Sequence, residues 1–136
     1  MSDLEQWPTA RLLITASRLV ENAYNEELAG LGITYAGLTV LAVLAAQGAL
    51  KQADLAEELK VQNPSVGKMI ERLARKGFVT GTRCWPDRRT QLITISPAGQ
   101  DVLSKARGLE DRLQLPEAAG KASLRDQARR LIATYW

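Results

Sequence analysis

The sequence predicts a mainly helical fold that contains one small β-hairpin, and three observations support this prediction. Apolar residues recur at helical spacing over most of the 136 residues, with Gly and Pro separating several of these stretches. Only the stretch 78–95 combines strand-like residues with a polar turn, as a hairpin does. Hydrophobic residues make up 46% of the chain, which favours a packed core over disorder. At this length we expect one domain.

The first three predicted helices form a supporting framework. Residues 9–31 carry an apolar stripe that is too broad for a single lightly buried face, so we expect a subunit interface there, with a purely core role as the alternative. Thr34 suits the N-cap of a second, almost wholly apolar helix over 35–46. A third helix over 51–60 turns acidic residues outward, which makes it a poor element for contacting an anion.

A fourth helix is predicted from Asn63 to Lys76. Asn63 can cap it, Pro64 suits the first helical position, and Gly77 suits a left-handed end. One face of this helix is apolar and the opposite face is basic and polar. The apolar residues are Val66, Met69, Ile70 and Leu73; Lys68, Glu71 and Arg75 lie opposite, with Ser65 and Arg72 on a flank.

Two strands and two further helices complete the predicted order. The strands cover 78–85 and 90–95, and residues 86–89 form a charged turn between them. Ser96 and Pro97 then begin a helix whose apolar spacing continues as far as Leu113. A closing helix follows Ser123, where a sequence like a capping box begins, and carries apolar residues to Trp136.

Positive charge is concentrated on the fourth helix and the hairpin. The window 60–89 holds eight Lys and Arg against two acids, a net charge of +6, whereas the whole chain carries +3. Such a local surplus indicates a site for a polyanion. The third helix, a short turn, the fourth helix and the hairpin have the order of a helix-turn-helix followed by a wing. Because a helix fits the major groove of DNA, this order predicts binding to double-stranded DNA.

The candidate DNA contacts fall into two groups. From the recognition helix, Gln62, Asn63, Ser65 and Lys68 are placed to reach base edges, and Arg72 and Arg75 to reach phosphates or further bases. From the wing, Asp87, Arg88 and Arg89 stand at the turn, where the arginines can enter a neighbouring minor groove. Gln and Asn pair well with adenine, and Lys or Arg with guanine.

Composition argues against several other functions. The chain has no His, which removes the commonest general base and transition-metal ligand, so we expect no enzyme, no metal site and no cofactor. Its one cysteine, Cys84, cannot form an internal disulfide, which fits a reducing compartment. The acidic N-terminus does not look like a signal peptide, and no run of about 18 apolar residues occurs. We therefore expect a cytoplasmic protein without membrane association.

Two segments of the sequence resemble the MarR family of winged helix-turn-helix regulators. They are AGLTVLAVLAAQGALKQADLAEELKVQNPSVGKMIERLARKGFV and CWPDRRTQLITISPAG, and the resemblance runs from about Ala36 to Gly99. The family's Asp-x-Arg wing signature falls on Asp87 and Arg89. The resemblance implies one domain over 1–136, with a winged helix-turn-helix lobe at 33–96 and dimerisation helices at 1–32 and 97–136.

The resemblance also implies how such a protein works. It implies a homodimer on a pseudo-palindromic operator, more often a repressor than an activator, in which the wing Asp holds the wing Arg in the minor groove. Many members release DNA when a small aromatic or phenolic effector binds between the dimer region and the DNA-binding lobe. Trp7, Tyr24 and Tyr35 are the candidate pocket residues, with packing in a dimer core as the alternative.

Three departures and two alternatives accompany the resemblance. Lys51 stands where the family usually has Thr or Ser, no Cys lies near the first helix, and no His is present, so peroxide and metal sensing of the family's kinds are not expected. One alternative function is a winged-helix module that binds protein. The other is a thiol-based redox switch at Cys84, whose neighbour Arg83 could lower the thiol pKa. Neither explains why positive charge gathers on the helix and the hairpin together.

Overall fold

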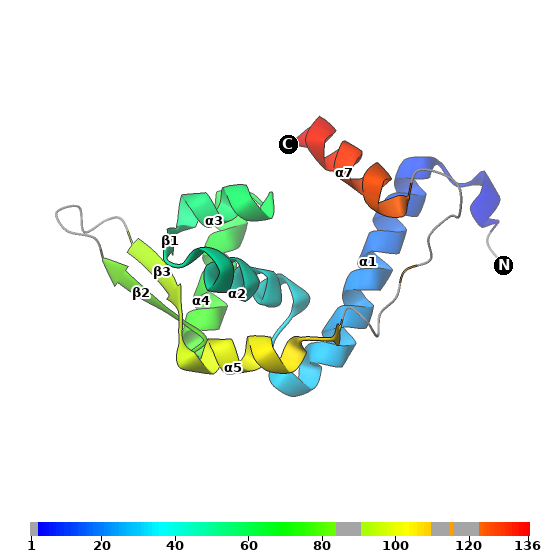
Figure 1. The fold of residues 1–136 in the computed structure, drawn as a ribbon. Coiled ribbons are helices and arrows are strands. Elements are labelled where there is room, and N and C mark those ends of the chain that lie inside the picture. Colours follow the sequence, from blue (N-terminus) through cyan, green and yellow to red (C-terminus); the bar gives the residue numbers. More distant parts are fainter. Residues whose placement is uncertain (1–2, 84–90, 110–114, 116–122) are drawn as a thin grey trace.

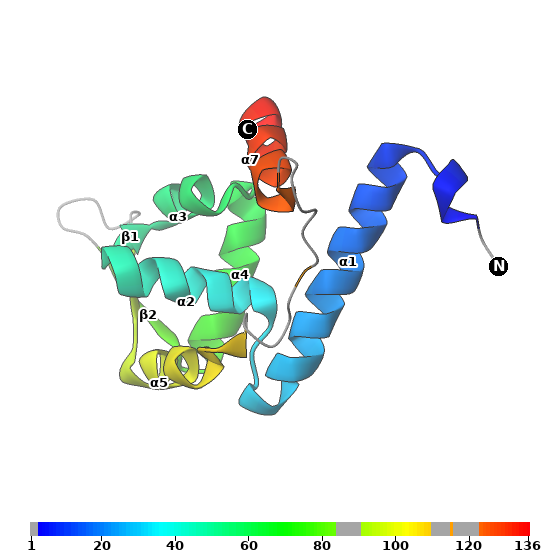
Figure 2. The ribbon, with the colours of Figure 1, turned by 45° about the vertical axis from the view of Figure 1, so that its right-hand side comes forward.

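A long N-terminal helix extends away from a lobe of shorter helices and a three-stranded sheet (Figures 1 and 2). The structure is a computed structural model, and it describes residues 3–83, 91–109, 115 and 123–136. The helices are α1 (Thr9–Leu28), α2 (Tyr35–Gln47), α3 (Gln52–Leu59), α4 (Asn63–Arg75), α5 (Pro97–Ala106) and α7 (Leu124–Tyr135), and two short 3₁₀ turns cover Leu4–Gln6 and Ala29–Leu31.

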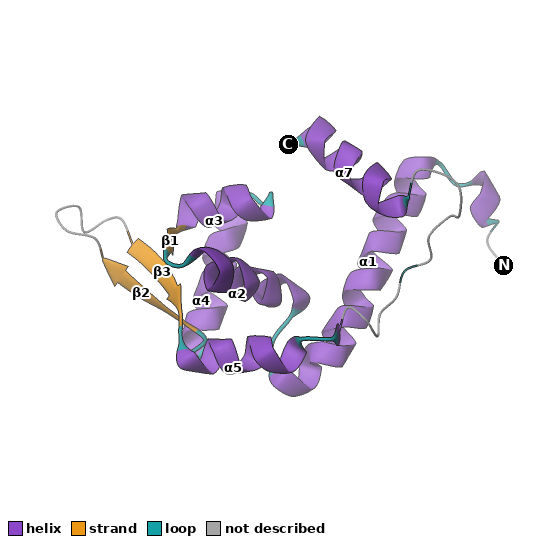
Figure 3. Cartoon of the chain, viewed as in Figure 1, coloured by secondary structure: helices purple, strands orange, loops and turns teal. Residues whose placement is uncertain are grey.

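The sheet lies at one end of the lobe, as the orange arrows of Figure 3 show. Strand β2 (Val79–Arg83) and strand β3 (Gln91–Ile95) pair antiparallel, with Val79 opposite Ile95. The two-residue strand β1 (Leu50–Lys51) pairs with the other edge of β3, so the strand order is β1-β3-β2. The predicted hairpin of a mainly α fold is confirmed. Strand β1 was not predicted, because a strand of two residues is too short to produce a recognisable sequence pattern.

Helix α2 is the centre of the core. Val40, Leu41 and Leu44 on this helix are 1% exposed or less. They belong to one buried cluster that also includes residues of the surrounding elements, namely Leu28, Ile33, Leu55, Val66, Ile70, Leu73, Val79, Ile93 and Val102. Because these buried residues come from α1, α3, α4, the sheet and α5, the lobe is held together as one body around α2.

Side-chain caps begin three helices where the sequence predicted them. The Thr34 hydroxyl accepts from Gly37 N–H at 3.2 Å at the start of α2, and Ser96 accepts from Gly99 N–H at 3.0 Å at the start of α5. Ser123 accepts from Asp126 N–H at 3.1 Å at the start of α7. Each bond satisfies a backbone donor that the helix itself leaves unpaired.

The fifth helix is shorter than the sequence predicted. The apolar spacing indicated one helix from Pro97 as far as Leu113, but α5 ends at Ala106. Arg107 takes an extended conformation (ψ of 141°), and Gly108 has a φ of +87°, which is left-handed. A glycine in this conformation interrupts the helical path directly after α5.

Among the described residues, no single helix has the length and apolar content to cross a membrane. One bent pair, Thr9–Leu31 with Tyr35–Gln47, passes on length and composition when the two are taken together, with an angle of 75° between them. The second helix of that pair is α2, the buried helix of the core.

Candidate nucleic-acid interface

Helix α4 presents one apolar face to the lobe and one basic face to solvent. Val66, Ile70 and Leu73 are at most 8% exposed, and Met69 packs partly buried beside them. The basic residues Lys68, Arg72, Arg75 and Lys76 are all exposed. The predicted division of this helix into two faces is therefore confirmed. Burial of its apolar face fixes which side chains face outward, because a helical side chain cannot change sides without unpacking the core.

Helix α3 joins α4 through a very short turn. Lys60 has a φ of +56°, and its N–H bonds back to the carbonyls of Ala56 and Glu57 to close α3. Only Val61 and Gln62 then separate Lys60 from the first residue of α4. Helices α3 and α4 pack against each other through Leu55 and Val66, both fully buried. This is the arrangement of a helix-turn-helix, with α4 as its second helix.

The first turn of α4 is anchored to α3 in a way that the sequence did not predict. Asn63 is the first residue of the helix and not its cap, because Gln62 occupies the cap position without a side-chain bond. The Asn63 side chain instead accepts a hydrogen bond from the amide of Gln52, with 2.6 Å between Nε2 and Oδ1. The expected capping role of Asn63 is therefore wrong, and the residue is occupied by a partner eleven positions earlier.

The opposite end of α4 is fixed to two other parts of the lobe. The Lys76 amine donates to the backbone carbonyl of Gly32, at the junction of α1 and α2. Gly77 has a φ of +79°, as predicted for the residue that ends this helix. The Ser96 hydroxyl donates to the Gly77 carbonyl at 2.6 Å, and Ser96 N–H donates to the Phe78 carbonyl at 3.0 Å. Helix α4, the wing and the start of α5 therefore meet at one point.

The wing strands are well paired up to the turn that joins them. Thr80 and Thr94 share a side-chain hydrogen bond of 2.8 Å across β2 and β3. The turn residues lie outside the described residues, and these include Asp87, Arg88, Arg89 and Cys84. The DNA contacts predicted for the first three, and the redox role considered for Cys84, remain sequence-based predictions.

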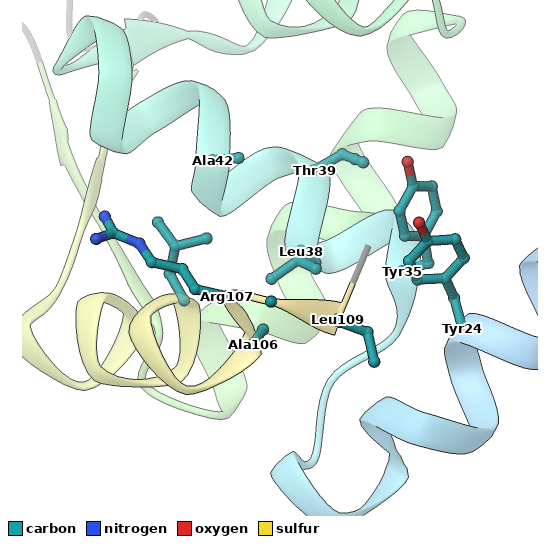
Figure 4. A pocket seen from close by; sticks show the side chains of 10 residues that line it. Tyr24, Tyr35, Leu38, Thr39, Ala42, Ala106, Arg107 and Leu109 are labelled. Carbon is teal, nitrogen blue, oxygen red and sulfur yellow. The ribbon is translucent and has the colours of Figure 1, made fainter. Parts of the chain in front are cut away.

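A pocket of about 320 Å³ lies where α1, α2 and the end of α5 meet, as Figure 4 shows. The rings of Tyr24 and Tyr35 stand 4.6 Å apart between their centroids on one side of it. Arg107 is the charged residue among those that line it. The remaining lining residues are mostly apolar and come from α2 and the end of α5: Leu38, Thr39, Ala42, Leu103, Ala106, Gly108 and Leu109.

Trp7 does not share this pocket with the two tyrosines. It precedes α1, and the guanidinium of Arg11 lies 3.7 Å from the centroid of one of its rings. Tyr24 lies in the last part of the same 20-residue helix. The sequence grouped Trp7 with Tyr24 and Tyr35, but the structure separates it from them, because the length of α1 stands between.

Sequence reasoning missed Gln52 and Arg107 as residues of these sites. Gln52 carries no motif or periodic signal, since its role depends on which residue of α4 comes opposite. Arg107 stood within an apolar pattern that looked like one continuous helix. The Gly at 108 was the available signal, because a glycine within a helical pattern often marks its end. In the described part of the chain, no group of three or more metal-binding side chains comes together.

Comparison with known proteins gives the same fold and a matching family. A model of the MarR family matches residues 33–90. The transcriptional repressor MdtR of Bacillus subtilis is 35% identical over 68 residues, which are 50% of this chain and 44% of that protein. The alignments to the curated relatives span about half the length of those relatives.

Two solved structures resemble the whole chain. A mutant MarR from Escherichia coli, complexed with operator DNA, gives a TM-score of 0.78 at 24% identity and covers 99% of this chain and 100% of that chain. The PcaV regulator of Streptomyces coelicolor, in complex with its natural ligand, gives a TM-score of 0.68 at 25% identity. The match covers 99% of this chain and 97% of that chain. Residues 33–90 of this chain therefore match the MarR family, and the chain as a whole has the fold of these two regulators.

Proposed function

We propose that this protein is a sequence-specific regulator of transcription that binds double-stranded DNA as a homodimer. The observation that carries the proposal is the basic, exposed face of α4, which stands on a buried apolar face and belongs to a helix-turn-helix of the MarR family. Helix α4 enters the major groove, where Gln62, Asn63, Ser65 and Lys68 face bases. Arg72 and Arg75 lie farther along and contact phosphates. Asp87, Arg88 and Arg89 form the wing contact with the minor groove.

The dimer is formed by the two terminal regions, residues 1–32 and 97–136. Helix α1 buries only Leu28 within the chain, and Leu12, Leu13 and Leu19 of its apolar stripe remain exposed. Every residue of α7 is exposed as well, including Leu131 and Tyr135. Uncovered apolar surface of this extent favours a partner, and a second copy supplies the same surface. Two-fold symmetry then calls for a pseudo-palindromic operator with half-sites about 34 Å apart.

We expect DNA binding to repress transcription, and we expect a small aromatic or phenolic effector to regulate that binding. The relative MdtR is named a repressor, and a protein that occupies a promoter blocks it without a further surface. The pocket beside Tyr24, Tyr35 and Arg107 lies between α1 and the DNA-binding lobe. A ligand there relieves repression if it binds one arrangement of the dimer more tightly than the other. We place the protein in the cytoplasm with its DNA, and we propose no catalytic step for it.

Selection of bound DNA from a random pool tests this function. We expect a pseudo-palindrome with half-sites about 10 base pairs apart. Lys68→Ala should then relax preference at one position in each half-site and cost about 1–3 kcal/mol at the selected sequence. The matched control is Lys105→Ala, which removes an exposed lysine from α5 that pairs with Asp101 at 3.0 Å. It should leave affinity and preference unchanged.

Two results would count against the proposal. A pool that yields no preferred sequence, with salt-insensitive binding to a protein instead, would favour a protein-interaction module. Equal loss of affinity for all sequences in Lys68→Ala would move Lys68 from base contact to backbone contact. Addition of phenolic compounds to the selected complex tests the effector separately, with release of DNA as the expected result.

A further inference from the structure

Gln52 holds the side chain of Asn63 in one orientation. Its amide nitrogen lies 3.1 Å from the backbone carbonyl oxygen of Asn63 and 2.6 Å from the side-chain oxygen of the same residue. A backbone carbonyl can only accept, so the Gln52 atom that faces it is the nitrogen, and both of its hydrogens are used. The Asn63 atom that receives the second hydrogen must also be an acceptor. The orientation of both amide groups therefore follows from the one fixed carbonyl.

Gly67 makes room for this contact. A Cβ atom built on Gly67 would stand 3.0 Å from Nε2 of Gln52 and 3.5 Å from its amide carbon. Gly67 lies one turn after Asn63 on the same helix, so the half-buried Gln52 side chain lies across the first turn of α4. A side chain at 67 would require the Gln52 amide to give by a few tenths of an ångström, which would loosen its contact with Asn63. Gln52, Asn63 and Gly67 thus form one contact, which we call the α3–α4 clamp.

The clamp determines what Asn63 can offer to a ligand. Oδ1 and Nδ2 diverge from one carbon, so an Oδ1 turned toward Gln52 directs Nδ2 away from α3. Asn63 itself is exposed. Its outward group is then a hydrogen-bond donor. Reading adenine with both atoms of an amide needs Oδ1 and Nδ2 side by side toward the base, because adenine presents a donor next to an acceptor. Guanine presents two acceptors in the major groove, whereas adenine and thymine each present only one, N7 and O4.

We propose that Gln52 is a positioning residue for specificity, which fixes Asn63 as a donor so that Asn63 favours guanine over adenine. The proposal rests on the proposed function, since it names what one residue of the recognition helix reads. Asn in general pairs well with adenine. Here the hydrogen bonds from Gln52 change that expectation, because they leave Asn63 with only a donor facing outward.

Random-pool selection on four proteins tests the proposal: wild type, Gln52→Met, Asn63→Ala and the double variant. Gln52→Met keeps size and neutrality but has no donor. The base position read by Asn63 is the one whose preference Asn63→Ala abolishes, a loss of roughly tenfold. We expect guanine there in the wild type. Gln52→Met should reduce that preference to about threefold or less, and it should change nothing further when Asn63 is already Ala.

Gly67→Ala separates positioning from folding. Alanine in place of glycine inside a helix favours folding, so this variant should keep or raise the melting temperature while losing the same base preference as Gln52→Met. Gln47→Ala, which removes an exposed glutamine from the end of α2, is the matched control and should retain the preference. A purely structural role for Gln52 would instead lower the melting temperature and the affinity for every sequence, with the preference intact.

The outcomes are distinct from those of the proposed function. Adenine at the position read by Asn63 would overturn the inference, and so would an unchanged preference in Gln52→Met or independent effects in the double variant. Each of these leaves sequence-specific DNA binding standing. A wild-type protein with no preferred sequence would overturn the proposed function first.

Discussion

A single left-handed residue sets the spacing of the helix-turn-helix. Lys60 is the one non-glycine residue with a positive φ in the described part of the chain. Its amine donates to the Glu57 carbonyl at 3.0 Å and stands 6.0 Å from the centroid of the Trp136 ring. A left-handed conformation costs an ordinary residue about 1–2 kcal/mol. The short connection between α3 and α4 therefore requires Lys60 to adopt a backbone conformation that lysine disfavours.

Replacing this residue by glycine should stabilise the fold. We expect Lys60→Gly to raise the free energy of unfolding by about 0.5–1 kcal/mol, because glycine adopts the conformation freely but gives up more chain entropy. Urea unfolding followed by circular dichroism measures it. Lys105→Gly, inside α5, is the control and should lower stability by about 1 kcal/mol. Destabilisation of similar size in both variants would mean that the contacts of the Lys60 side chain outweigh its strain.

Residue-level prediction succeeded where the chemistry is local. Thr34, Ser96 and Ser123 cap helices as expected, because the donor lies three residues away in the sequence. Asn63 was assigned the same role and failed, because Gln52 competes for its oxygen from another helix. No property of the neighbouring sequence reports that partner.

The junction of α4, the wing and α5 leaves no room for a side chain at Gly99. A Cβ on Gly99 would come within 2.2 Å of the Phe78 backbone oxygen, which is closer than two such atoms can approach. Ser96 is held by the Gly77 and Phe78 carbonyls at the same place. The start of α5 is therefore pressed against the base of the wing, and only glycine fits there.

An alanine at this junction should destabilise the whole lobe. Gly99→Ala must move backbone atoms, so we expect a loss of about 1–3 kcal/mol or more. Gly30→Ala is the matched control, since nothing lies within 4 Å of the Cβ it would add. Thermal unfolding of the two variants gives the comparison. Equal melting temperatures for both would show that the junction can open at little cost.

Element-level prediction followed periodicity and failed where periodicity misleads. The helices around α2 and the paired strands lie where their apolar patterns placed them, since burial of one face creates the pattern. The predicted extension of α5 to Leu113 is wrong because the apolar spacing continues past a backbone break at Arg107 and Gly108. Strand β1 escaped prediction because its two residues pair with β3 only through the tertiary fold.

At the scale of the molecule, the exposed apolar stripe on α1 is the feature that supports the proposed dimer. Leu19 is 56% exposed although it lies in the apolar stripe of that helix. Leu28 at the end of the same helix is 1% exposed, because it reaches the core of the lobe. A helix that is buried at one end and uncovered along an apolar face points to a second surface, and the proposed dimer supplies it.

A charge in the stripe should separate the proposed dimer. Leu19→Glu removes roughly 1.5–3 kcal/mol of apolar burial from each of two symmetric copies, so the dimer dissociation constant should rise about a hundredfold or more. Sedimentation velocity across a dilution series measures the change. Asn22→Glu, at an exposed polar position of α1, is the control and should remain dimeric. A Leu19→Glu protein that stays dimeric at the same dilution would place the interface elsewhere.

Ser96 ties the first turn of α5 to the carbonyls that follow α4. We therefore expect a tilt of α5 to carry α4 and the wing with it. In a paired molecule, such a tilt would alter the separation of the two reading helices and leave their shapes intact. Operators with one base pair inserted or deleted at the centre would therefore discriminate between the arrangements of the pair.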